Sequence, residues 1–277
     1  MPKADPTGLP PYETIALVLQ GGGALGAYQA GVFEGLQEAG IPLNRLAGIS
    51  IGALNTAIIA GNAPEHRLDR LREFWETICQ PNTPFMALSP FVEQSIFNVN
   101  DATRQFLGHL NASRAILDGQ RGFFRPRIPA PVLPNVHCEP GQASYYDISD
   151  LKITLERLCD FDRINRCELH VSVGAVNVRN GNFVYFDNRE MTLRAEHFMA
   201  SGALPPAFPP VEIDGELYWD GGLVSNTPLG DVLQQRPMRD TLVFQVDLWS
   251  ARGGAPTNLG EVYDRMQDIR YSSRTRF

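Results

Sequence analysis

The sequence predicts an α/β fold built on a parallel sheet, in a single domain that carries one insertion. Apolar runs of strand length alternate with helical patterns along the chain, which is typical of parallel strands joined by crossover helices. Glycine-rich turns join a strand to a helix twice near the N-terminus. The 277 residues are enough for one such domain with a well-buried core.

The first 80 residues give this pattern most clearly. An apolar run at 15–19 predicts a buried strand, and it ends in a glycine turn that leads to a helix over 26–40. A second short strand around Leu46 leads through another glycine turn to a helix over 53–60. A third helix begins at Pro64, because proline suits the first helical turn.

The middle of the chain interrupts the pattern. Between residues 81 and 144 prolines are frequent and periodicity weakens, which predicts an insertion that serves as a lid or a substrate wall. Regular structure returns with a helix over 148–159 and strands at 169–178 and 183–186. A hairpin over 211–219 follows, with its turn at Asp214-Gly215.

The C-terminal third closes the predicted domain at about residue 250. Asn226-Thr227-Pro228 is expected to cap a helix with proline at its first position, before a last buried strand at 241–248. Residues 251–277 predict a helical tail. Its apolar stripe at Val262, Met266 and Ile269 has no partner strand after it, so we expect the chain to end early relative to its relatives.

The composition excludes several classes of protein. With 43% hydrophobic residues the chain is too apolar for disorder, and a formal charge of -7 gives no positive field for a nucleic-acid partner. The four cysteines show no C-x-x-C pair, which is typical of reduced thiols. Residues 1–14 predict a flexible segment and not a signal peptide, and no apolar run reaches membrane-spanning length. These features predict a cytoplasmic protein.

Ser50 is the candidate nucleophile. It lies at the centre of Gly48-Ile49-Ser50-Ile51-Gly52, a G-x-S-x-G sequence between a predicted strand and a predicted helix. Gly48 and Gly52 permit the tight turn that lifts the hydroxyl clear of the sheet. The alternative is a small-residue turn in which Ser50 only caps a helix.

The loop Gly21-Gly22-Gly23-Ala24-Leu25-Gly26 also lies between a strand and a helix, so its backbone amides form an anion site. In an esterase that anion is the oxyanion of the tetrahedral intermediate. The same loop matches G-x-G-x-x-G, the dinucleotide fingerprint, which requires an acidic residue about 20 positions further on. No Asp or Glu occurs between Ala39 and Pro64, which weakens the dinucleotide interpretation.

A nucleophilic serine needs a base, and the histidines are poor candidates. The last of the five, His197, lies within an apparent helix, and the others lack a glycine-turn or carboxylate context. Asp220 is better placed, because Gly221 and Gly222 after it allow the backbone to turn its carboxylate into a cleft. The hairpin turn is already supplied by Asp214-Gly215.

Four motifs occur together in a fixed order over roughly residues 15 to 250: Gln20-Gly21-Gly22-Gly23-Ala24-Leu25-Gly26, Gly48-Ile49-Ser50-Ile51-Gly52, Ala200-Ser201-Gly202-Ala203 with Phe208-Pro209-Pro210, and Asp220-Gly221-Gly222. Together they resemble the patatin-like phospholipase family. The resemblance implies a three-layer α/β/α fold with a central, mostly parallel sheet. It also implies a Ser–Asp dyad of Ser50 and Asp220, with the backbone of Gly21, Gly22 and Gly23 as the oxyanion hole.

One position departs from the family. Leu25 stands where many members carry Arg or Lys, which bears on the preference for a phospholipid headgroup and leaves the dyad untouched. An exposed Asp has a pKa near 3.9 and is a weak base. We therefore expect apolar walls such as Leu25, Ile51, Phe208 and Trp219 to raise the pKa of Asp220.

The predicted function is that of a serine lipid acyl hydrolase acting on a lipid or acyl ester, with no cofactor and no metal. A nucleotide-binding oxidoreductase that uses the G-x-G-x-x-G loop and a non-catalytic lipid-binding protein remain as alternatives. Within the insertion, basic and aromatic residues favour a peripheral membrane contact, with solvated loop charges as the alternative. These residues are Arg114, Arg121, Phe123, Phe124, Arg125 and Arg127. The oligomeric state is left open by the sequence.

Overall fold

In the computed structural model, residues 10–80, 115–128 and 137–273 are described. Their centre is a seven-stranded sheet in the order β7-β8-β5-β2-β1-β9, with β6 also paired to β5. The parallel strands are β1 (Thr14–Leu19), β2 (Arg45–Gly48), β5 (His170–Asn177) and β9 (Thr241–Val246). The antiparallel strands are β6 (Phe183–Asp187), β7 (Val211–Ile213) and β8 (Glu216–Asp220). The core of the sheet is therefore mostly parallel, as predicted.

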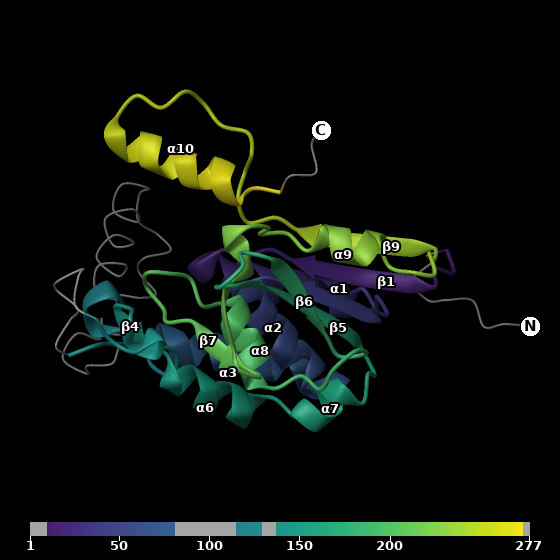
Figure 1. Ribbon diagram of the computed structural model, residues 1–277. Coiled ribbons are helices and arrows are strands. Elements are labelled where there is room, and N and C mark those ends of the chain that lie inside the picture. The colour runs from purple at the N-terminus through teal and green to yellow at the C-terminus, as the bar shows by residue number, and fades with distance from the viewer. Residues whose placement is uncertain (1–9, 81–114, 129–136, 274–277) are drawn as a thin grey trace, which may run out of the picture.

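Helices cover both faces of this sheet unequally. One face carries α1 (Ala27–Glu38), α2 (Ile51–Ala60), α3 (Arg67–Cys79), α6 (Ser149–Leu158), α7 (Phe161–Asn165) and α8 (Ala195–Ser201). The opposite face carries the short α9 (Leu229–Leu233), which packs on β2. Figure 1 shows α2, α3, α6 and α8 gathered on one side of the sheet and α9 on the other. This is the three-layer α/β/α arrangement.

The alternation of side chains along β1 explains the two faces. Leu17 and Leu19 point into the large core beneath α2, whereas Ala16 and Val18 belong to a second, smaller cluster with Val232 of α9. All six residues of β1 are buried. A strand covered on both faces is mostly apolar, which is why residues 15–19 show an apolar run and no polar alternation.

Most predicted elements are confirmed, with three differences. Helix α2 begins at Ile51, directly after Ser50, and so earlier than expected. Helix α7 was not predicted, because five residues are too short for a recognisable period. The expected cap of α9 is wrong: Pro228 is the N-cap itself, the helix begins at Leu229, and the Asn226 side chain bonds elsewhere.

Short 3-10 turns complete the connections at Gly23–Gly26, Pro64–His66, Pro140–Gln142 and Gly221–Leu223. The first of these forms the last four residues of the glycine loop after β1, and the last follows Asp220. Compact turns therefore occur at two of the predicted site segments.

The predicted insertion is only partly described, since residues 81–114, with Arg114, and 129–136 lie outside the described ranges. In the described part, β3 (Arg125–Pro126) pairs with β4 (Tyr146–Asp147). The rings of Phe123, Phe124, Tyr146 and Phe208 pack against one another, and Phe124 is 9% exposed. Phe124 is the buried member of this cluster, and the membrane contact expected of Phe123 and Phe124 stays a prediction.

The arginines of the same segment make hydrogen bonds to the protein. Arg125 pairs with Asp150 at 2.7 Å, and Arg127 donates to the Ser144 hydroxyl at 3.1 Å. Arg121 donates to the Gln80 side chain at 2.8 Å. The bonds of Arg121 and Arg125 join the insertion to the end of α3 and to α6, whereas Ser144, the partner of Arg127, belongs to the insertion itself.

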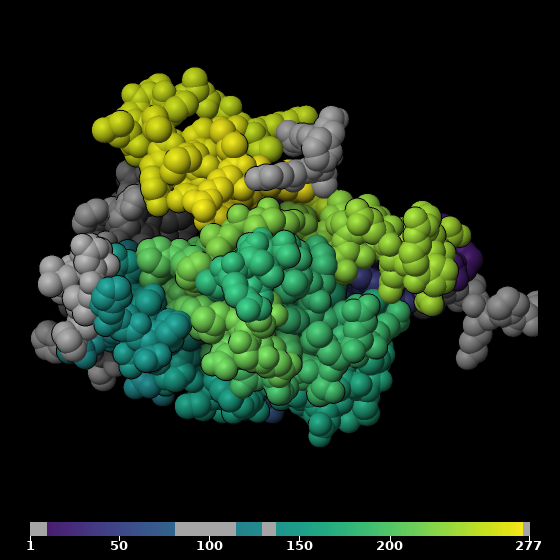
Figure 2. Space-filling model, in the orientation of Figure 1, coloured from purple at the N-terminus to yellow at the C-terminus, as the bar shows by residue number. Residues whose placement is uncertain are grey.

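The C-terminal tail is the helix α10 (Leu259–Tyr271), whose N-terminus is capped by the Asn258 side chain. Figure 2 shows this segment as a yellow ridge standing above the rest of the surface. Its exposed apolar side chains are Leu259, Val262, Tyr263, Met266 and Ile269. Among the described helices, none combines the length and apolar character required to cross a bilayer.

Candidate active site

The candidate residues meet at the carboxyl ends of β1 and β2, the edge where open α/β sheets bind ligands. The glycine loop leaves β1, Ser50 follows β2, and Asp220 ends β8. They line a pocket of about 70 Å³ together with further residues. The complete lining is Gly21, Gly22, Gly23, Ser50, Leu204, Asp220, Gly222, Asn226, Trp249 and Tyr271.

Ser50 occupies a strained turn. Its backbone angles are φ 56° and ψ -124°, a conformation that non-glycine residues rarely adopt and that is often found at functional sites. A Cβ atom on Gly48 would come within 2.5 Å of the Gly52 carbonyl oxygen, and one on Gly52 would collide with the Leu19 carbonyl. Glycine is therefore required on both sides of Ser50, as the motif predicts.

Helix α8 supports this turn from behind. The backbone amide of Ser50 donates a hydrogen bond of 3.0 Å to the hydroxyl of Ser201, a fully buried residue of α8. The bond fixes the start of the turn. The Ala200-Ser201-Gly202 motif thus contributes a support for the serine and does not itself line the pocket.

The three glycines after β1 are not equivalent. The Gly21 amide donates to the Asn226 carbonyl at 3.2 Å and is occupied. The amides of Gly22 and Gly23 have no acceptor among the described residues. Gly23 also has a φ of 55°, which favours glycine. Two donors of the loop are therefore available to an anion in the pocket.

Asp220 lies deep in the site, 2% exposed. Burial raises the pKa of its carboxyl group to about 7, and hydrogen bonds from the Gly222 amide and the Ser50 hydroxyl oppose this rise. The bond from the Gly222 amide measures 2.7 Å. The structure thus brings together a hydroxyl and a carboxylate that lie far apart in the sequence.

Gly221 and Gly222 let the chain turn directly after Asp220. A Cβ atom on Gly221 would come within 2.6 Å of the Gly174 carbonyl in β5, and one on Gly222 within 3.0 Å of the Asp220 carboxylate. Larger residues at either position would displace the backbone that carries Asp220. The Asp-Gly-Gly sequence is therefore part of the site and not a hairpin turn.

The chain matches a known protein family. A sequence profile described as patatin-like phospholipase matches residues 17–233, which include the glycine loop, Ser50 and Asp220. The chain belongs to the patatin-like phospholipase family.

Several patatin-like relatives are much longer. The chain is 28% identical over 240 residues to patatin-like phospholipase domain-containing protein 6 of Mus musculus. This alignment covers 86% of this chain and 14% of that protein. The chain is 52% identical to lysophospholipase nte1 of Aspergillus terreus over 51 residues, an alignment that covers 18% of this chain and 3% of the relative. It is 53% identical to neuropathy target esterase sws of Drosophila persimilis over 46 residues, and this alignment covers 17% of this chain and 3% of the relative. The chain therefore spans a small part of these relatives.

Among solved structures, the chain is similar to VipD from Legionella pneumophila. The TM-score is 0.44 at 16% sequence identity, and the match covers 85% of this chain and 50% of that one.

The walls of the patatin-like pocket differ from those expected. Leu25, Ile51, Phe208 and Trp219 are absent from its lining among the described residues, and Leu25 is 46% exposed. Leu204, Trp249 and Tyr271 form the apolar walls in their place. Trp249 lies just beyond the last parallel strand, so its position at a strand's carboxyl end was a signal that sequence reasoning missed.

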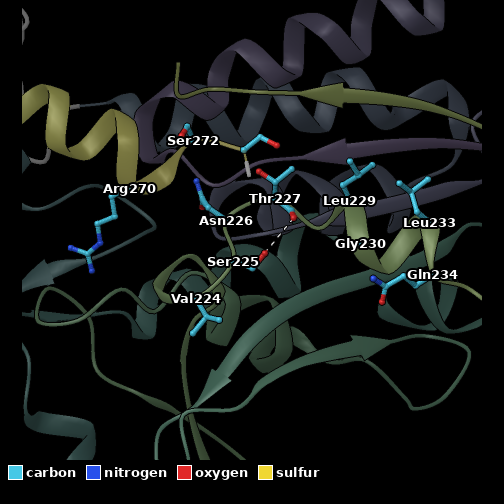
Figure 3. Close-up of a pocket in the computed structure, with 11 residues that line it drawn as sticks. Val224, Ser225, Asn226, Thr227, Leu229, Gly230, Leu233, Gln234, Arg270 and Ser272 are labelled. Carbon is cyan, nitrogen blue, oxygen red and sulfur yellow. Dashed lines mark hydrogen bonds between the residues drawn. The ribbon is translucent and has the colours of Figure 1, made fainter. Parts of the chain in front are cut away.

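A second and larger cavity of about 320 Å³ lies beside the first and shares Asn226 with it. Figure 3 shows Asn226 and Thr227 between α9, with Leu229 and Leu233, and the end of α10, with Arg270 and Ser272. Within residues 10–80, 115–128 and 137–273, no three His, Cys, Asp or Glu side chains gather as metal ligands.

Proposed function

We propose that this patatin-like chain is a serine lipid acyl hydrolase that cleaves carboxylic esters of lipids and phospholipids. Ser50 is the nucleophile, Asp220 is its base, and the amides of Gly22 and Gly23 hold the oxyanion. Gly21, expected as a third donor, serves as an anchor of the loop because its amide is occupied by Asn226. The relatives whose printed names include lysophospholipase and esterase support an ester substrate.

One observation carries the proposal: a buried carboxylate beside Ser50 with its pKa raised to about 7. A general base is most effective when its pKa lies near the working pH, because it is then both ionised and basic. An exposed aspartate is ionised at neutral pH but is only weakly basic. Burial of Asp220 corrects this deficiency without a histidine.

The reaction follows from the placement of these groups. Asp220 accepts the Ser50 proton while the serine oxygen attacks the acyl carbonyl, and the Gly22 and Gly23 amides stabilise the resulting oxyanion. When the intermediate collapses, the protonated Asp220 returns the proton to the leaving alcohol. A water molecule then attacks the acyl-enzyme with Asp220 as base, and its proton returns to Ser50 as the fatty acid is released.

The test is fatty-acid release from mixed micelles of a phospholipid, a lysophospholipid or a diacylglycerol. We expect hydrolysis by the wild type, and a loss of about 10²–10⁴ in kcat for Ser50→Ala and Asp220→Asn. Full turnover by Asp220→Asn would contradict the assignment of the base. Binding to the micelles without release would favour the non-catalytic alternative, and reduction of a nicotinamide cofactor would favour the oxidoreductase.

A further inference from the structure

The carbonyl of Gly21 is held by two side chains from distant parts of the chain. Asn226 Nδ2 donates to it at 2.9 Å, and Trp249 Nε1 donates to it at 2.8 Å. Gly21 also donates its own amide to the Asn226 carbonyl. The backbone of Gly21 is thus fixed from two directions, although Gly21 itself offers no free donor to the pocket.

This anchoring determines where the next amide points. The peptide between Gly21 and Gly22 is trans, and in a planar trans peptide the carbonyl and the N–H point in opposite directions. Two hydrogen bonds that fix the Gly21 carbonyl therefore also fix the direction of the Gly22 N–H. That N–H is one of the two donors of the loop without an acceptor among the described residues.

The next peptide is fixed in the same way from within the loop. Leu25 donates its amide to the Gly22 carbonyl at 3.1 Å, which sets the direction of the Gly23 N–H. The N–H groups of Gly22 and Gly23 are therefore held in direction by different kinds of hydrogen bond. Gly23 depends on a local turn, whereas Gly22 depends on two side chains far along the sequence.

The two anchors are themselves braced by the C-terminal segment. Asn226 Nδ2 also donates to the Tyr271 carbonyl at 2.8 Å, and Gln20 Nε2 donates to the same carbonyl at 3.1 Å. The Trp249 ring lies against the Tyr271 ring, with centroids 5.4 Å apart. Figure 3 shows Asn226 facing the end of α10. Trp249 and Tyr271 both lie beyond residue 233, where the family match ends.

Gln20 completes the brace. It is fully buried, and its Oε1 accepts the backbone amides of Leu248 at 2.6 Å and Trp249 at 3.1 Å. The residue before the glycine loop therefore fixes the backbone of Trp249, whose indole then returns to the Gly21 carbonyl. This closed set of bonds leaves little freedom for the Gly21–Gly22 peptide to rotate.

We propose that Asn226 and Trp249 are positioning residues that aim the Gly22 amide at the developing oxyanion, with Tyr271 as their brace. The inference rests on the proposed function. Because the Gly22 amide acts on charge that develops in the transition state, loosening its anchor lowers kcat and leaves KM nearly unchanged. A residue that only walled the pocket would affect KM instead.

The sharpest variant is Trp249→Phe, which removes the indole donor and keeps an aromatic ring against Tyr271. Loss of a whole oxyanion donor costs about 10²–10³ in rate, so loss of one of two anchors is expected to lower kcat about 10-fold. The acid limb of the pH profile stays in place, because Asp220 is untouched. The control is Asn165→Ala, which removes side-chain bonds of 2.8 Å to the Phe161 carbonyl and 2.9 Å to the Leu193 carbonyl, outside the pocket lining, and leaves kcat unchanged.

A second variant, Asn226→Ala, removes the other donor and is judged by the same criteria if Trp249→Phe folds poorly. Labelling of Ser50 by a fluorophosphonate distinguishes a failure of the proposed function from a failure of the positioning role. No labelling of the wild type would reject the proposed function. Wild-type labelling together with an unchanged kcat, or a change in KM alone, in the anchor variants would overturn the positioning role.

Discussion

At the scale of single residues, Asp220 connects stability with chemistry. Among the described residues that line its pocket there is no cation, and burial is the leading cause of its raised pKa. The folded protein therefore holds the Asp220 proton more tightly than the unfolded chain does. Ionising this carboxyl group costs folding free energy, and the same ionisation creates the base that we propose for Ser50.

The first prediction concerns the stability of Asp220→Asn. Since the folded pKa of about 7 lies above the ordinary value of 3.8, stability falls as the pH rises between these values. Asparagine removes this cost, so the stability of the variant relative to the wild type rises by about 1.4 kcal/mol per pH unit in that window. Urea unfolding at about pH 5 and about pH 8 measures it. A relative stability independent of pH would contradict the burial of a titrating carboxyl group.

The second prediction concerns the glycines. Gly52→Ala forces a Cβ atom into the Leu19 carbonyl, so we expect a loss of about 1–3 kcal/mol in unfolding free energy and slower labelling of Ser50. Gly35 lies in α1 with open space around its Cβ position. Gly35→Ala is therefore the control and is expected to stabilise the protein by about 0.5–1 kcal/mol. Equal effects at the two positions would count against the close approach at Gly52.

Sequence reasoning named the residues of the proposed dyad and missed the side chains that hold the glycine loop beside it. Ser50 and Asp220 lie in short motifs whose chemistry depends on local backbone geometry. Asn226 was assigned to a helix cap, because its true partners, the carbonyls of Gly21 and Tyr271, lie 205 and 45 positions away. No local pattern encodes such bonds, since they depend on how β1, β9 and α10 meet in space.

At the scale of elements, α8 contributes to the site through one buried hydroxyl. The Ser201 hydroxyl accepts a hydrogen bond from the Ser50 amide, so α8 is joined directly to the strained turn. A buried donor that loses its acceptor has no hydrogen bond to water and none to the protein, which destabilises the folded state. The start of the turn at Ser50 is therefore sensitive to a substitution on a different helix.

The third prediction follows from this bond. Ser201→Ala leaves the Ser50 amide unpaired, and we expect a loss of about 1–3 kcal/mol in unfolding free energy. Thr56 in α2 provides the contrasting case, because its buried hydroxyl has no hydrogen-bond partner within the described part of the chain. Thr56→Val is expected to be neutral or stabilising. Thermal unfolding compares the two variants, and a harmless Ser201→Ala would reject the support role of α8.

The elements themselves were predictable to different degrees. Strands β1 and β5 are buried along their whole length, and the apolar run 15–19 of β1 stands out in the sequence. In β5 the valines are interrupted by buried polar residues such as Ser172, so its signal is weaker. Helix α7, with five residues, is too short to show a period, and α9 begins after an irregular turn. The prediction of a C-terminal helix is confirmed by α10. Its contact with the site through the Tyr271 carbonyl required the three-dimensional structure.

At the scale of the whole molecule, the proposed nucleophile and a buried polar network lie at opposite ends of the parallel strands. The carboxyl edge carries Ser50. The opposite edge carries a buried polar network in which Arg45, 2% exposed, pairs with Asp231 at 2.6 Å and donates to His170 at 2.9 Å. His170 in turn bonds Asp187 at 2.5 Å. This network ties β2, β5, β6 and α9 together away from the pocket.

The fourth prediction tests this division. Asp231→Asn leaves the buried Arg45 without its paired carboxylate, and we expect a loss of about 3 kcal/mol in unfolding free energy. The rate of Ser50 labelling stays the same while the protein is folded. Asp69→Asn is the control, because it breaks an exposed pair with Arg72 at 3.7 Å and is expected to cost under about 1 kcal/mol. A lower labelling rate in folded Asp231→Asn would show that the edges are coupled.

The most direct test of the Ser50 and Asp220 pair is the pH dependence of Ser50 labelling by a fluorophosphonate, in the wild type and in Asp220→Asn. The wild-type rate is expected to rise with pH through one ionisation near the raised pKa of about 7. In Asp220→Asn the rate is expected to be low and to lack this ionisation. An Asp220→Asn rate equal to that of the wild type, with the same ionisation, would contradict the role of Asp220 as base.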